Sequence, residues 1–167
     1  MFLFDNSFEK KVLMCLFFGM FLCVSHAQNE DVTTEVKKYF LIAASTTNYE
    51  EALSSATSIA EKLKLPLDLR KLEYSDENLG LTWSKEECEG SNWGYPCYVA
   101  RGRYDDGDFV SIEWSSAYGG FSKGYYIVIV SGNQIYDDSL KDLLRKTKEF
   151  VPSAYIKSSM VYMGCLH

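Results

Sequence analysis

The sequence has 167 residues, of which 47% are hydrophobic, and it carries a net charge of −6 at pH 7. A chain of this length has room for one domain with its own core and is short for two. Its acidity makes nucleic acid a poor candidate for a partner, because phosphates attract basic surfaces.

Residues 1–27 predict a secretory signal peptide. A lysine pair at 10–11 precedes an apolar stretch over 12–24, and Ser-His-Ala at 25–27 places small residues where a signal peptidase cuts. The apolar stretch is shorter than the roughly 20 residues that a membrane-spanning helix needs. We therefore expect cleavage, a single domain over 28–167, no membrane span after cleavage, and a location in the periplasm or cell envelope.

Two stretches of the chain repeat one pattern, in which an apolar strand-like run is followed by a helical period and then by another strand-like run. Acidic residues open each helical stretch and a proline follows it, as expected of a helix start and stop. In chain order the predicted elements are a strand at 39–44, a helix to about 64, and strands at 67–72 and 125–131, followed by a helix at 137–150 and a strand at 154–163.

The region 74–124 separates the two copies of this pattern and predicts an inserted β-hairpin. Alternating runs at 98–104 and 109–115 flank the sequence Asp-Asp-Gly-Asp at 105–108, which is typical of a hairpin turn. The expected fold class is α+β. It consists of two strand–helix–strand units that share an antiparallel sheet, with two helices on one face and the hairpin inserted.

The strand-like runs Tyr39–Ser45 and Tyr125–Ser131 resemble those of the SPOR (sporulation-related repeat) domain. Each has an aromatic start, then apolar residues, then a small residue or valine and a serine. The stretch 154–167 also resembles the ending of exported proteins of Bacteroidetes-type bacteria. The resemblance implies a ferredoxin-like sandwich and non-enzymatic recognition of peptidoglycan glycan strands without peptides, across the open face of the sheet.

By the motif match, the open face of the sheet carries four candidate ligand-binding residues: Phe40, Ile42, Tyr126 and Val128. The family favours polar residues at several of these positions. An apolar face here would either be covered by the inserted hairpin or form an interface with another protein, because a bare apolar patch promotes association.

Three cysteines follow the predicted signal, and export permits disulfides. Cys88 and Cys97 flank a loop with two glycines and a proline, which suits a bridge between them, and Cys165 would then be the odd thiol. Other pairings with Cys165 stay open at this point. We expect no metal and no cofactor, since the cysteines lack metal-ligand spacing and His167 is the one histidine after the signal.

Two further pairs of side chains are candidate ligand-binding residues. Trp93 and Tyr95 lie in the cysteine loop, where aromatic rings stack on sugars or anchor protein partners. Arg101 and Arg103 alternate along a predicted strand, so both would face one side, with Glu113 as a cross-strand partner. They would hold an anion such as a carboxylate, or form a solvated face paired with acidic residues.

We expect no catalytic residue in this chain. Nucleophilic catalysis needs a base held in a cleft, and the one candidate histidine is the last residue. The aspartates at 105–108 are interpreted as turn residues rather than paired carboxylates. The predicted function is an exported binding domain for peptidoglycan glycan. The alternative is a module that binds an envelope protein, as an inhibitor or immunity partner does.

Overall fold

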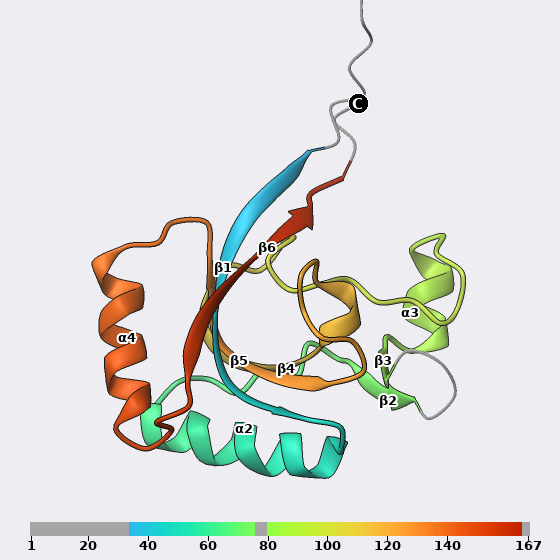
Figure 1. Cartoon of the computed structure of the whole chain (residues 1–167). Helices are drawn as coiled ribbons and strands as arrows, with labels where there is room; N and C mark the ends of the chain where they lie inside the picture. The colour runs from blue at the N-terminus through green and yellow to red at the C-terminus, as the bar shows by residue number, and fades with distance from the viewer. Residues whose placement is uncertain (1–33, 76–79, 165–167) are drawn as a thin grey trace, which may run out of the picture. The chain divides into compact units, whose positions relative to one another are not determined.

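The computed structural model describes residues 34–75 and 80–164 (Figure 1). The predicted signal peptide at 1–27, Cys165 and His167 lie outside these described residues. Within them, no helix has the length and apolar character needed to cross a membrane.

A four-stranded antiparallel sheet forms the centre of the described domain, which is therefore α+β (Figure 1). The strand order is β4-β5-β1-β6, so the two strands that start the repeated patterns, β1 and β5, are neighbours in the middle. Both are apolar on both faces, as central strands covered on two sides are expected to be. The bounds are β1 Glu35–Thr46, β4 Gly107–Trp114, β5 Tyr126–Asn133 and β6 Tyr155–Tyr162.

Two amphipathic helices cover one face of this sheet, and both begin with a side-chain cap. The Asn48 side chain accepts from the Glu51 backbone N–H at the start of α2 (Tyr49–Leu63), and the Asp137 carboxylate caps α4 (Asp138–Lys148) in the same way. Their buried side chains join those of the sheet in what we call the helix-side core. This core includes Leu41, Ala52, Ala56, Ile59, Ile112, Val128, Val130 and Leu140.

The predicted strand at 67–72 is not formed. Arg70 and Lys71 have φ angles of 58° and 55°, in the left-handed region, which breaks an extended run. This segment makes a single parallel bridge from Leu67 to Val110. The chain then forms a separate two-stranded sheet from β2 (Glu73–Ser75) and β3 (Gly80–Thr82), followed by the short helix α3 (Lys85–Gly90).

The predicted hairpin between 98–104 and 109–115 is wrong, because β4 pairs with β5 and residues 98–104 form a loop. Gly102 has a φ of 95° and turns the chain. Side chains, rather than a neighbouring strand, accept hydrogen bonds from backbone N–H groups of this loop. The Arg101 N–H donates to the Tyr118 hydroxyl at 3.0 Å, and the Gly102 N–H donates to Asp105 Oδ1 at 2.9 Å.

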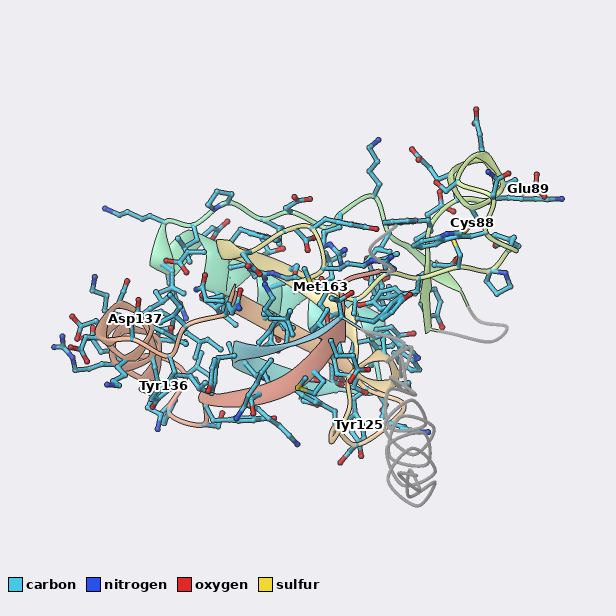
Figure 2. The ribbon with its side chains drawn as sticks, turned by 90° about the horizontal axis from the view of Figure 1, so that it is seen from above. Cys88, Glu89, Tyr125, Tyr136, Asp137 and Met163 are labelled. Atoms are coloured by element: carbon cyan, nitrogen blue, oxygen red, sulfur yellow. A yellow bond between two sulfur atoms is a disulfide. The ribbon has the colours of Figure 1, made fainter. Side chains whose placement is uncertain are left out.

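The second face of the sheet, opposite the helices, is also covered. Its apolar residues are Phe40, Ile42, Ile127, Ile129 and Val161, and they pack with Ala100, Tyr118, Phe121 and Met163 from the loops 98–106 and 115–124 and the end of β6. We call this side the covered face. Figure 2 shows Met163 over the sheet, with α3 and Cys88 on one side and Asp137 at the start of α4 on the other.

Candidate functional site

Four of the predicted ligand-binding residues are buried in the two cores. Phe40 and Ile42 are 0% and 1% exposed and lie on the covered face, whereas Tyr126 and Val128 are 5% and 0% exposed and lie in the helix-side core. The prediction that they share an open face is wrong. The antiparallel register places Ile42 opposite Ile129, so Ile42 shares a face with Ile129 and not with the adjacent Val128. A shift of one residue in the pairing reverses the face of every side chain in a strand.

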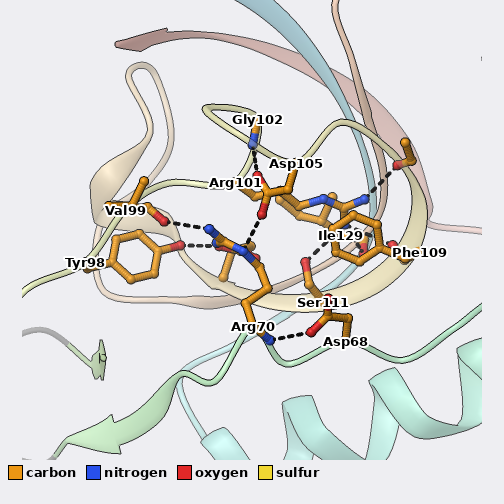
Figure 3. Close-up of polar contacts among 12 residues, drawn as sticks. Asp68, Arg70, Tyr98, Val99, Arg101, Gly102, Asp105, Phe109, Ser111 and Ile129 are labelled. Atoms are coloured by element: carbon orange, nitrogen blue, oxygen red, sulfur yellow. Dashed lines mark hydrogen bonds and ion pairs between the residues drawn. The ribbon is translucent and has the colours of Figure 1, made fainter. Parts of the chain in front are cut away.

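Arg101 is also buried, at 0% exposure, and its guanidinium joins its loop to strands β4 and β5 rather than facing solvent. Nη1 donates to Phe109 O, Ser111 Oγ and Ile129 O at 2.9–3.1 Å, and Nη2 donates to Gly107 O at 2.8 Å (Figure 3). Because burial disfavours its charge, the pKa of Arg101 lies below the usual value. The predicted shared face of Arg101 and Arg103 is therefore corrected: their segment is a loop, and Arg101 faces inward.

A second buried arginine, Arg70, lies beside Arg101 and pairs with carboxylates (Figure 3). Its Nη1 contacts Glu113 Oε2 at 2.8 Å, and its Nε contacts Asp105 Oδ2 at 2.6 Å. Nη2 donates to Val99 O at 3.1 Å. Arg70 thus replaces the partner predicted for Glu113. Nothing in the sequence indicated this pair, because the two residues come from different elements and Arg70 is in a segment predicted as a strand.

Two tyrosine hydroxyls complete this buried network around Glu113. Tyr98 donates to Glu113 in a short hydrogen bond, and Tyr118 donates to the same oxygen at 3.2 Å. The pKa of each tyrosine is raised well above its usual value, first because burial disfavours the phenolate and second because the Glu113 charge opposes it. Burial alone would lower the pKa of Arg70, but the neighbouring carboxylate of Glu113 raises it above the ordinary value.

These raised pKa values predict a loss of stability in alkali. Above about pH 10 an unfolded tyrosine ionises while the folded one keeps its proton, so the free energy of unfolding falls as pH rises. The expected slope is about 1.4 kcal/mol per pH unit for each of Tyr98 and Tyr118. We expect Tyr98→Phe to reduce the slope measured by urea unfolding between about pH 10 and 11.5. Equal slopes for the variant and the wild type would contradict this.

A groove of about 460 Å³ lies beside this network. The loop 98–100 forms one side and the end of β6 the other. The lining includes Glu35, Tyr98, Arg103, Met160 and Tyr162. Tyr98 belongs to both regions, because it lines the groove and its hydroxyl donates to Glu113.

Arg103 is the centre of an aromatic cluster at this groove. Its guanidinium carbon lies 5.6 Å from the ring centre of Trp93, 5.0 Å from that of Tyr104 and 5.1 Å from that of Tyr162. Each is within the range of a cation–π contact. The structure therefore brings together Arg103 and Trp93, two of the predicted ligand-binding residues. Of the three rings, that of Tyr162 belongs to the groove lining, whereas Trp93 and Tyr104 contact Arg103 from outside it. We call the groove, together with these two flanking rings, the Arg103 groove.

The disulfide loop supports Trp93 at the edge of this groove. Cys88 and Cys97 are bonded, which confirms the predicted pair. Within the loop, the Trp93 N–H donates to Cys88 O at 2.9 Å, and the Trp93 ring stacks on Trp83 at 5.8 Å between ring centres. By restricting the unfolded loop, such a bridge contributes about 2–3 kcal/mol. Tyr95, on the same loop, is 48% exposed and is outside the groove lining.

A second depression, of about 380 Å³, lies beside the start of α4 and is acidic. Its three carboxylates already have structural roles. Asp106 pairs with Lys38 at 2.6 Å, Asp108 accepts from the Ser131 hydroxyl, and Asp137 caps α4. Among the residues that the structure describes, no cluster of histidine, cysteine or acidic residues has an arrangement that would hold a metal ion.

No protein-family model, curated protein or solved structure matches this chain. The geometry and chemistry of the Arg103 groove are therefore the basis for inferring a function.

Proposed function

We propose that this chain is an exported, non-enzymatic binding domain that recognises peptidoglycan glycan strands in the Arg103 groove. The observation that carries the proposal is the set of three aromatic rings around Arg103, which lines a groove together with one of them, Tyr162. Aromatic rings pack on the C–H faces of sugars, and a guanidinium hydrogen-bonds their oxygen substituents. A strand order of β4-β5-β1-β6 with helices α2 and α4 in one core supports a ferredoxin-like, SPOR-like arrangement.

The recognition surface in this proposal differs from the sheet face that the SPOR resemblance implies. The covered face is filled by the loops 98–106 and 115–124, which bury Phe40 and Ile42. The Arg103 groove is built on top of one of these loops. In this chain, the inserted region would have moved the binding surface from the strands to the loop that covers them.

A binding role, rather than cleavage of the glycan, is favoured by the positions of the carboxylates. Cleavage of a glycosidic bond ordinarily needs two carboxyl groups on either side of it. Glu113 is 0% exposed and is held by Arg70, so it cannot reach a substrate. Of the described residues that line the groove, Glu35 alone carries a carboxylate.

Retention of the purified chain on peptidoglycan tests this proposal. We expect binding to amidase-treated sacculi, which carry bare glycan, and at least about 10-fold weaker retention for Trp93→Ala, as for an aromatic anchor. Tyr136→Ala is the matched control, because Tyr136 is 49% exposed and lies near α4, away from α3 (Figure 2). Both variants should remain folded at the assay temperature, as their melting transitions show. No retention of the wild type above an unrelated acidic protein would reject the proposal.

Recognition of an envelope protein remains the second candidate function, and one observation favours it. Tyr95 is 48% exposed and lies outside the Arg103 groove, so the aromatic surface extends beyond it. Protein interfaces often use exposed tyrosines as anchors. In that case Tyr95→Ala would weaken capture of an envelope protein, whereas a glycan confined to the groove would not respond to this substitution.

A further inference from the structure

The four arginines of this chain differ in what their guanidinium groups contact. Arg70 has two carboxylates, Arg101 has four oxygen acceptors, and Arg145 has Asp142. Among the described residues, the Arg103 guanidinium contacts the three rings and has no carboxylate at ion-pair distance, and its buried Nε has no hydrogen-bond partner. Arg103 is therefore the arginine whose charge lacks an oxygen acceptor in this part of the chain.

Building on the proposed function, we infer that Arg103 makes the groove selective for a saccharide that carries a carboxylate. A guanidinium presents paired N–H groups at the spacing of the two carboxylate oxygens, so it binds them with two parallel hydrogen bonds. Because Nε is buried and three rings flank the guanidinium, the cation is partly shielded from water, which strengthens this interaction relative to one in bulk solvent. In this arrangement the rings contact the sugar and the Arg103 guanidinium binds its carboxylate.

The surrounding charge favours a ligand with one negative charge per sugar over a phosphorylated one. Glu35 lines the same groove, and the whole chain has a net charge of −6. A dianionic phosphate would be repelled more strongly by these charges than a carboxylate, because the repulsion grows with the charge of the ligand. A single arginine in an acidic surface is thus suited to a monoanion.

Two sources of a carboxylated sugar share this chemistry. In peptide-free wall glycan, each muramic acid unit carries a free lactyl carboxylate, and in uronate polysaccharides the carboxylate is part of the sugar ring. The probes are therefore an oligosaccharide of alternating N-acetylglucosamine and N-acetylmuramic acid, its methyl ester, a neutral N-acetylglucosamine oligomer of equal length, and an oligogalacturonate.

Titration calorimetry of the wild type with these probes tests the inference. Since hydrogen bonds to a charged group contribute more than neutral ones, we expect the free acid to bind about 10- to 100-fold more tightly than its methyl ester. Tighter binding of the oligogalacturonate than of the muramic acid probe would support the inference and move the ligand source away from the wall. Equal affinity for the acid and its ester would overturn it.

Three variants separate a selective role of Arg103 from a structural one. Arg103→Gln should bind the acid and the ester equally, and it should still bind the ester through the rings. Arg103→Lys should keep only part of the preference for the acid, because lysine retains the charge without the paired N–H groups of the guanidinium. Arg145→Gln, on the exposed side of α4, should behave as the wild type. A preference for the acid that survives in Arg103→Gln would overturn the inference. If the wild type binds none of the saccharides, the proposed function is rejected instead.

Discussion

Replacing Glu113 with alanine is expected to lower the free energy of unfolding by about 3–5 kcal/mol. The Glu113 side chain is 0% exposed, and its partner Arg70 is 8% exposed. Removal of the carboxylate would leave the Arg70 charge buried with Asp105 as its remaining anionic partner, and it would leave the hydroxyls of Tyr98 and Tyr118 without their acceptor. Urea unfolding measures this loss.

The matched comparison is the double variant Arg70→Met with Glu113→Gln, which removes both charges at once. A buried ion pair replaced by neutral groups of similar volume often costs little. We therefore expect the double variant to be more stable than the sum of its single variants predicts, with a coupling free energy of about 1.5–3 kcal/mol. Additive single effects would show that Arg70 and Glu113 are not coupled as the structure indicates.

The repeated strand–helix pattern could be predicted because each of its elements has local causes. The runs that became β1 and β5 are apolar on both faces, the helix caps are formed by Asn48 and Asp137, and prolines follow α2 and α4. Such signals act over a few residues and need no knowledge of the partner strand. The sheet that joins these elements is formed as the pattern indicates, with β1 beside β5.

The inserted region could not be predicted in the same way, because its structure depends on contacts between distant residues. An alternating run at 98–104 has the pattern of a strand, but its backbone is satisfied by Tyr118 and Asp105. The run at 67–72 also alternates, but Arg70 takes a left-handed conformation where its side chain reaches Glu113. In both cases buried polar contacts outweighed local strand propensity.

The candidate site was partly visible in the sequence. The Cys88–Cys97 bridge and the tryptophan between these residues follow from a Gly/Pro loop, and both parts are present in the structure. Arg103 was selected for a strand face that does not exist, and it lies at the groove because the loop places it there. Tyr104 and Tyr162 were missed as its neighbours, since only the folded loop brings β6 close to Trp93.

Substitution of Phe40 tests whether the ligand binds at the sheet face or at the loop that covers it. The Phe40 ring is 0% exposed, lies 5.2 Å from the Tyr118 ring in an edge-on contact, and is so close to Gly132 that a Cβ there would be 3.0 Å from it. Phe40→Ala is expected to lower the free energy of unfolding by about 3–5 kcal/mol, from lost apolar burial and the cavity left behind.

The control for Phe40→Ala is Ile135→Ala, where the side chain is 68% exposed and the change should stay within about 0.5 kcal/mol. Urea unfolding of both variants measures the loss of stability. Glycan retention is measured without denaturant, at a temperature where both variants are folded. Together the two measurements separate a core role of Phe40 from a ligand-binding role. A core residue gives a large loss of stability with retention unchanged. A ligand-binding residue on an open face would give the opposite result, with wild-type stability and weakened retention, and the loops 98–106 and 115–124 would then not cover the sheet.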